Sequence, residues 1–179
     1  MKKLIPLTFA MLVSTYTSTV CADNSWYLGA SYNAQDISLN DRDFNTAGVV
    51  AGYKYNQYFA IETRFSSGTS GYSYGSYSED IDTIASLSIR ASYPIFDSFK
   101  LYGLAGYTNT KLKIKGGGDN NPFKITHSDG GLSYGLGLNY EINEQFNLFI
   151  DYQVLPDFEP ISTFSKSWKS TTFGVNYSF

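Results

Sequence analysis

Residues 132–140, LSYGLGLNY, alternate strictly between two kinds of side chain. Leucine or tyrosine occupies every second position from Leu132 to Tyr140, and serine, glycine or asparagine fills the positions between them. Successive side chains of a β-strand point to opposite faces of its sheet. This period of two therefore predicts a strand with one apolar face and one small or polar face.

Seven further stretches of the chain show the same period, and each again has one apolar face. Their apolar positions run over residues 26–32, 47–53, 59–65, 85–93, 99–107, 148–154 and 171–179. Together with residues 132–140, they predict eight strands and an all-β fold.

The links between the predicted strands alternate in length. Hairpin-length turns are expected near residues 56–57, 94–98 and 143–145. The other links are long and cover residues 35–43, 66–80, 110–130 and 156–168. Short turns at one end and four long loops at the other are typical of an antiparallel up-and-down meander. An even number of strands places both chain termini at the short-turn end.

The composition excludes several other classes of protein. The 179 residues include 13 Phe, 16 Tyr, 2 Trp and 16 Gly, and only 16% are charged, which is too apolar for a disordered chain. No stretch after the N-terminus approaches the roughly 20 consecutive apolar residues of a membrane-spanning helix. The net charge of -3 and the lack of a basic helix argue against a nucleic-acid partner.

The first 22 residues have the pattern of a signal peptide. Lys2 and Lys3 provide a positive start, residues 4–13 are apolar, and residues 20–22 form a cleavage site. We therefore expect a signal peptide over residues 1–22 and a single barrel domain over residues 23–179.

Two closed barrels fit the pattern, and they differ in which face points inward. A soluble barrel of the lipocalin type turns its apolar face inward, whereas a membrane barrel turns it toward lipid. Glu62, Arg64, Arg90 and Asp151 lie mid-strand on the polar face, among glycines that weaken an exposed strand but leave room in a narrow lumen. This arrangement favours the membrane barrel.

Aromatic residues of the predicted lipid face gather toward the strand ends. Such residues form girdles at both membrane interfaces of a transmembrane barrel. Those near the short turns are Trp26, Tyr53, Phe59, Tyr93, Phe99, Tyr140, Phe146 and Tyr177, and those toward the long loops are Tyr32, Phe44, Phe65, Tyr107 and Tyr152. The sequence therefore predicts an eight-stranded transmembrane barrel with short periplasmic turns and long extracellular loops.

The last strand carries a more specific resemblance. Phe173, Val175, Tyr177 and the terminal Phe179 alternate on one face. This strand resembles the C-terminal strand of bacterial outer-membrane barrels, and the whole domain resembles the small eight-stranded family of the OmpA membrane domain, OmpX and Ail. The resemblance implies export to the outer membrane of a Gram-negative bacterium and recognition of Phe179 by the assembly machinery. It also implies contact with outer-membrane lipid and lipopolysaccharide, and we expect a monomer.

The four lumen charges have two interpretations. An eight-stranded barrel is only wide enough to be filled by side chains, so the charges are expected to pair and plug the lumen. The alternative is a low-conductance pore for small solutes, and bulky Tyr102, Leu104 and Phe149 on the same face favour the plug.

The long loops are the candidates for contact with extracellular partners. Residues 66–78 form a Ser/Gly/Tyr tract whose Tyr72, Tyr74 and Tyr77 suit stacking on a sugar or a protein. Lys111, Lys113, Lys115 and Lys124 are candidate contacts to the phosphates of lipopolysaccharide, if the strand containing residues 99–107 extends beyond the membrane. The acidic residues Asp36, Asp41 and Asp43 are interpreted as solubilising charge, because their spacing matches no calcium loop.

No catalytic arrangement emerges, and no cofactor or metal is predicted. Lipid A deacylation would need a His and a Ser on one strand face, but His127 and Ser128 are adjacent and would face opposite ways. Asp129 shares the face of His127 without a serine, and Glu141 lies at the far end of the strand. We predict a non-enzymatic barrel with a structural and surface-interaction role in adhesion or envelope integrity. A pore is the alternative, and a lipid A-modifying enzyme is a more distant one.

Overall fold

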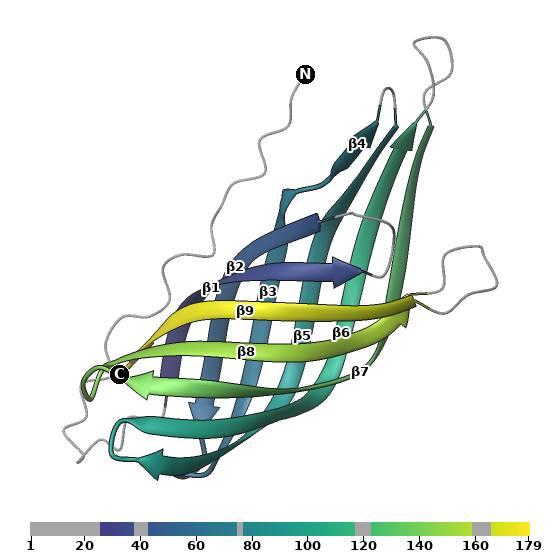
Figure 1. Ribbon diagram of the computed structural model, residues 1–179. Coiled ribbons are helices and arrows are strands. Elements are labelled where there is room, and N and C mark those ends of the chain that lie inside the picture. Colours follow the sequence, from purple (N-terminus) through teal and green to yellow (C-terminus); the bar gives the residue numbers. More distant parts are fainter. Residues whose placement is uncertain (1–25, 38–42, 75–76, 117–122, 159–165) are drawn as a thin grey trace, which may run out of the picture.

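The computed structural model describes residues 26–37, 43–74, 77–116, 123–158 and 166–179, all of which lie in strands or in the links between them (Figure 1). The strands are β1 (Trp26–Ile37), β2 (Asp43–Lys54), β3 (Phe59–Ser70), β4 (Tyr72–Tyr74), β5 (Tyr77–Phe96), β6 (Phe99–Gly116), β7 (Phe123–Glu141), β8 (Phe146–Phe158) and β9 (Lys166–Ser178). The described part of the chain contains no helix long and apolar enough to cross a bilayer. The predicted signal peptide, residues 1–22, lies outside the described residues.

The sheet closes on itself. Apart from the short β4, each strand pairs antiparallel with the next one in the chain, so that β3 pairs with β5. β1 pairs with β9 from Tyr27↔Ser178 to Ile37↔Trp168 and closes the wall. The three-residue β4 pairs only with β5 and extends one side of the wall. The predicted closed, eight-stranded, antiparallel up-and-down barrel is therefore confirmed.

Two of the three short turns have the same construction. Asn56 Oδ1 accepts hydrogen bonds from the backbone N–H groups of Tyr58 and Phe59, both at 2.8 Å. Asn143 Oδ1 accepts from those of Gln145 and Phe146 at 2.9 and 2.7 Å. The side chain of asparagine thus replaces a backbone acceptor in each tight reversal, which explains this residue type at both positions.

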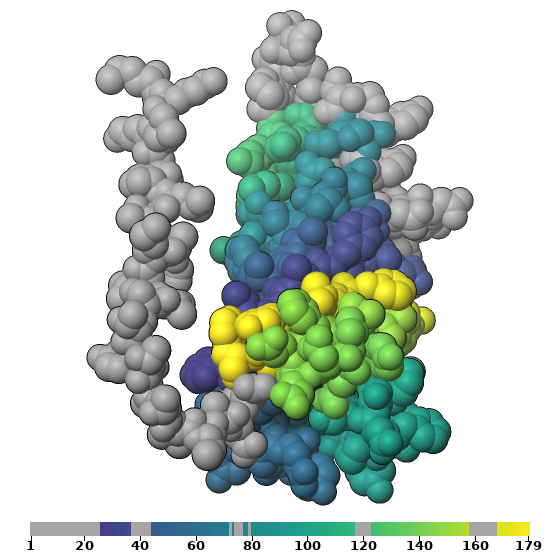
Figure 2. Space-filling model, turned by 90° about the vertical axis from the view of Figure 1, so that its left-hand side faces the viewer, coloured from purple at the N-terminus to yellow at the C-terminus, as the bar shows by residue number. Residues whose placement is uncertain are grey.

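The wall is much taller on one side than on the other. β5, β6 and β7 contain 20, 18 and 19 residues, whereas β1, β2 and β3 contain 12 each. In Figure 1 the ends of β4, β5, β6 and β7 stand above the rest of the barrel, and Figure 2 shows the same teal and green region rising above β1 and β9. At a rise of about 3.3 Å per residue, six to eight extra residues add about 20–26 Å.

The long loops predicted over residues 66–80 and 110–130 are therefore wrong over most of their length. β6 and β7 continue to pair from Lys111↔Ser128 up to Gly116↔Phe123, and residues 66–70 belong to β3. On the tall part of β6 the pattern is reversed, because Leu112 and Ile114 alternate with the outward Lys111, Lys113 and Lys115. An apolar outer face therefore no longer marks the strand, although its backbone pairing with β7 continues.

The apolar face points outward, as a transmembrane barrel requires. Leu132 is 81% exposed and Leu136 67%, whereas the neighbouring Ser133 is buried. At the short-turn end, the exposed aromatic rings touch across neighbouring strands. Ring centroids are 4.9 Å apart for Trp26–Tyr53, 4.8 Å for Phe99–Tyr140 and 5.1 Å for Phe146–Tyr177.

One aromatic residue departs from the predicted girdle. Phe44 is only 2% exposed and lies inside the barrel, not on its outer face. It shares the parity of Thr46 and Val50, both buried in the lumen. The side chain of Phe44 therefore points inward because of its position in the strand alternation, although the girdle was predicted from its aromatic ring.

Candidate functional site

The four predicted lumen charges lie inside the barrel and contact one another. Arg64 on β3 donates from Nη1 and Nη2 to the two carboxylate oxygens of Asp151 on β8, at 3.1 and 2.8 Å. Its Nε donates to Glu62 Oε1 at 2.7 Å. Arg90 on β5 donates to Glu62 Oε2 at 3.1 Å and to Asn139 Oδ1 at 3.2 Å. Asp151 thus pairs with Arg64, and Arg90 pairs with Glu62.

Two buried tyrosines complete this charge layer. Tyr27 donates its hydroxyl to Glu62 at 2.6 Å, and Tyr102 donates to Asp151 at 2.7 Å. The Arg90 guanidinium stacks 3.6 Å from the centre of the Tyr102 ring. Two carboxylates balance two guanidinium groups, and each carboxylate has additional hydrogen bonds, which is the condition for holding charges in a dry interior.

Tyr102 was predicted on the lumen face, but the hydrogen bonds from Tyr27 and Tyr102 to the carboxylates were not. The signal was nevertheless present, because both rings lie on the polar face of their strands, opposite glycines. A Cβ at Gly52 would lie 2.2 Å from the Tyr27 ring, and one at Gly137 would lie 2.5 Å from the Tyr102 ring. These glycines are therefore required by the close approach of a large side chain from the neighbouring strand.

A second closure of the lumen lies toward the extracellular end. It is an apolar cap, against which Leu112 packs, and is formed by Phe44, Ile81, Ile84, Leu155 and Trp168. Trp168 is 1% exposed, and its indole N–H donates to Gln35 Oε1 at 2.8 Å. Between the cap and Arg64 lies a polar cavity of only about 30 Å³. The described residues therefore fill the lumen at two levels.

The candidate lipopolysaccharide contacts lie on the outer face of the tall side of the wall. Lys111, Lys113 and Lys115 alternate along β6, and Lys115 is in register with Lys124 on β7. Two acidic neighbours on β5 were not predicted from the sequence. Asp82 forms an ion pair with Lys113, and Asp80 Oδ2 lies 3.9 Å from Lys115 Nζ.

The terminal strand presents its apolar residues outward. Phe173 is 55% exposed and Phe179 58%, and Val175 and Tyr177 lie on the same face between them. The backbone N–H of Phe179 donates to the carbonyl of Trp26 at 3.0 Å. The last residue therefore helps to close the barrel against its first strand.

The residues considered for catalysis and for calcium binding do not form a common site in the described part of the chain. His127 and Ser128 occupy consecutive positions of β7, and Ser128 Oγ donates to Asn109 Oδ1 at 3.3 Å. Asp129 accepts from the neighbouring Gly130 N–H. Asp41 lies outside the described residues. Within the described ranges, no three His, Cys, Asp or Glu side chains are grouped to hold a metal ion.

Comparison with known proteins agrees with this geometry. A family model described as the outer membrane protein beta-barrel domain matches residues 5–179. The chain belongs to this family. Family membership places the barrel in the outer membrane of a Gram-negative bacterium, with its apolar face toward lipid. No curated protein sequence matches the chain.

Solved barrels of the same architecture match nearly their whole length. Neisserial surface protein A has a TM-score of 0.65 at 18% identity, with coverage of 86% of this chain and 97% of that one. Ail of Yersinia pestis, in complex with the heparin analogue sucrose octasulfate, has a TM-score of 0.59 at 18% identity, covering 87% and 97%. OprG of Pseudomonas aeruginosa has a TM-score of 0.56 at 13% identity, covering 87% and 96%. At these identities the likeness concerns the fold alone.

Proposed function

We propose that this barrel is a non-conducting membrane anchor that holds an extracellular sheet, made of β4 and the upper ends of β5, β6 and β7, against partners at the cell surface. Its role is structural and interactive, in adhesion or envelope integrity, and the protein has no catalytic role. The observation that carries the proposal is the open edge of this sheet along β7.

That edge begins where the pairing between β7 and β8 ends. β8 pairs with β7 only from Tyr134 onward, while β6 pairs with β7 from Phe123. Pro156 of β8 still lies beside Gly131, so one side of β7 has no strand partner among the described residues over residues 123–130. An unpaired edge presents N–H and C=O groups ready for another extended chain. Phe123 and Ile125, each 47% exposed, supply apolar contacts beside it.

The lysines on the same sheet suit the anionic surface of the outer leaflet. Lys111 lies four residues beyond the exposed Tyr107 on β6, which is about 13 Å along the strand. Among the described residues, Lys111 and Lys124 have no carboxylate partner. We propose that these two, with Lys113 and Lys115, contact lipopolysaccharide phosphates and hold the sheet at the membrane surface.

The pore is the weaker alternative because both closures of the lumen would have to open. The charge layer and the apolar cap involve different residues, so removing one leaves the other in place.

A binding comparison on whole cells tests the proposal. Cells producing the wild type would be screened against immobilised host proteins and glycans, and for survival in bile salts. Ile125→Lys places a charge beside the open edge, and Thr69→Lys adds the same charge on the exposed upper end of β3. We expect Ile125→Lys to reduce binding or survival while Thr69→Lys behaves as wild type. Equal effects of the two variants, at equal surface levels, would contradict the proposal.

A further inference from the structure

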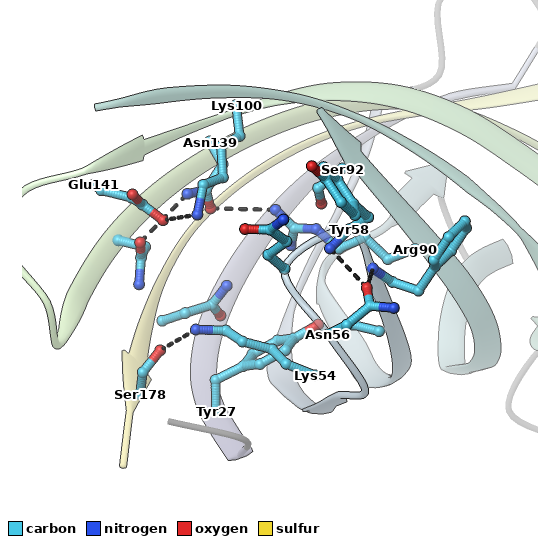
Figure 3. Close-up of a pocket in the computed structure, with 15 residues that line it drawn as sticks. Tyr27, Lys54, Asn56, Tyr58, Arg90, Ser92, Lys100, Asn139, Glu141 and Ser178 are labelled. Carbon is cyan, nitrogen blue, oxygen red and sulfur yellow. Dashed lines mark hydrogen bonds and ion pairs between the residues drawn. The ribbon is translucent and has the colours of Figure 1, made fainter. Parts of the chain in front are cut away.

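The periplasmic end of the lumen contains a cavity of about 80 Å³, named here the periplasmic vestibule. Its polar lining includes Lys54, Ser92, Lys100, Glu141, Asn147 and Ser178. Figure 3 shows Lys54 and Ser178 on one wall and Lys100 and Glu141 on the opposite wall. The vestibule lies on the other side of the charge layer from the extracellular sheet.

The charges around the vestibule do not balance. Lys100 Nζ lies 2.5 Å from Glu141 Oε1, so those two charges compensate each other. Arg90, in the inner wall, is paired with Glu62. Lys54 is half-buried and donates to Ser178 Oγ at 3.0 Å, and no carboxylate among the described residues pairs with it. One cation is therefore left over in a partly enclosed site.

The hydrogen bonds of the lining leave two donors for a ligand, together with one acceptor, Asn176 Oδ1, that has no hydrogen-bond partner among the described residues. Because Ser178 Oγ accepts from Lys54, the Ser178 hydroxyl hydrogen is free to donate. Arg90 donates to Asn139 Oδ1, and Asn139 Nδ2 donates to Asn147 Oδ1 at 3.3 Å. The Asn147 carbonyl oxygen is occupied in this chain of hydrogen bonds, which leaves its NH2 group to donate.

We propose that the periplasmic vestibule binds a small oxyanion, a carboxylate or a phosphate, through Lys54, Ser178 and Asn147. A surplus cation with hydroxyl and amide donors is the arrangement that favours such a group. A water molecule needs about 10–15 Å³ of such a cavity, so about 80 Å³ admits an anion of the size of acetate or phosphate. The barrel wall separates the vestibule from lipid, so the anion comes from the periplasmic solution.

Nuclear magnetic resonance of the refolded protein in zwitterionic lipid nanodiscs tests this site. Sodium phosphate and sodium acetate would be titrated at constant ionic strength set with sodium chloride, following the backbone amides of residues 54–58 and Ser178. We expect saturable shifts with at least one of the two anions. Lys54→Gln should weaken binding about tenfold or more, equivalent to about 1.4 kcal/mol. Glu141→Gln, which frees Lys100, should strengthen it severalfold.

Lys169→Gln is the matched control, since it removes a partly exposed lysine from the extracellular half of β9 and should leave the affinity unchanged. Shifts that do not saturate, or that are the same in Lys54→Gln and wild type, would overturn the proposal. A final arm replaces the nanodisc lipid with phosphatidylglycerol. If the vestibule signals respond to that lipid but to neither soluble anion, the ligand is a headgroup and the proposed source is wrong.

Discussion

Arg64 on β3 and Asp151 on β8 form a bidentate ion pair across the lumen, with N–O distances of 3.1 and 2.8 Å. The two residues are 87 positions apart in the chain, and their strands are not neighbours in the wall. The pair therefore ties opposite sides of the barrel together at the level of the charge layer.

Breaking this pair should destabilise the barrel strongly. Arg64→Ala or Asp151→Ala leaves a charge without its partner in a dry interior, which costs about 3–5 kcal/mol. The double variant should cost less than the sum, with a coupling of about 0.5–3 kcal/mol. Urea unfolding in lipid vesicles measures the cycle. The pair Lys100–Glu141, whose side chains are about 30% exposed, serves as the control and should couple by no more than about 1 kcal/mol. Strictly additive losses for Arg64 and Asp151 would show that the ion pair does not stabilise the barrel.

A charged residue on the outward face at the membrane midplane should destabilise the barrel. Leu136 lies mid-strand on β7 and is 67% exposed. Leu136→Arg would therefore place an arginine in lipid, at a cost of about 2–4 kcal/mol. Thr69→Arg, at the exposed extracellular end of β3, should be nearly neutral. Refolding titrations into vesicles compare the two. Equal tolerance at both positions would favour the soluble barrel.

The apolar cap should contribute to stability independently of the charge layer. Trp168→Ala removes a buried ring and its hydrogen bond to Gln35, and should cost about 3–5 kcal/mol. Because the charge layer remains, this variant should still not conduct ions. Trp168→Phe keeps most of the apolar volume and should lose less stability, which separates packing from a general intolerance at this position.

The terminal residue should matter for assembly. Deleting Phe179, or changing it to Asp, removes the aromatic end of the last strand and should sharply reduce folded protein in the outer membrane. The heat-modifiable band shift on gels measures the folded fraction. Phe173→Asp, which places the same charge on the same face away from the terminus, helps to separate terminal recognition from lipid exposure. An undiminished shift in the Phe179 variants would contradict a role in assembly.

The period of two was sufficient to predict the eight strands, their outward faces and the inward placement of Glu62, Arg64, Arg90 and Asp151. It was not sufficient for the pairing across the lumen, since strand tilt and stagger decide which level of one wall meets which level of the other. Arg64 and not Arg90 reaches Asp151 for this reason.

Other features depart from the apolar-outward period. In the upper part of β6, Leu112 and Ile114 alternate with outward lysines, so its apolar positions have the opposite parity to those of residues 99–107. The ion pairs of Asp80 and Asp82 with the β6 lysines depend on that extension, and on a register shift between Ile81 and Thr83. Trp168 lies beyond the alternating stretch used to predict the last strand, so its place in the cap could not be anticipated.

Ion conductance in planar bilayers tests the closed lumen most directly. The wild type should show negligible conductance, and so should Arg64→Ala and Trp168→Ala alone, because each retains one closure. The double variant Arg64→Ala/Trp168→Ala, which weakens both, should conduct if it still folds. A steady open channel in the wild-type protein would contradict the account and show that the lumen is a pore.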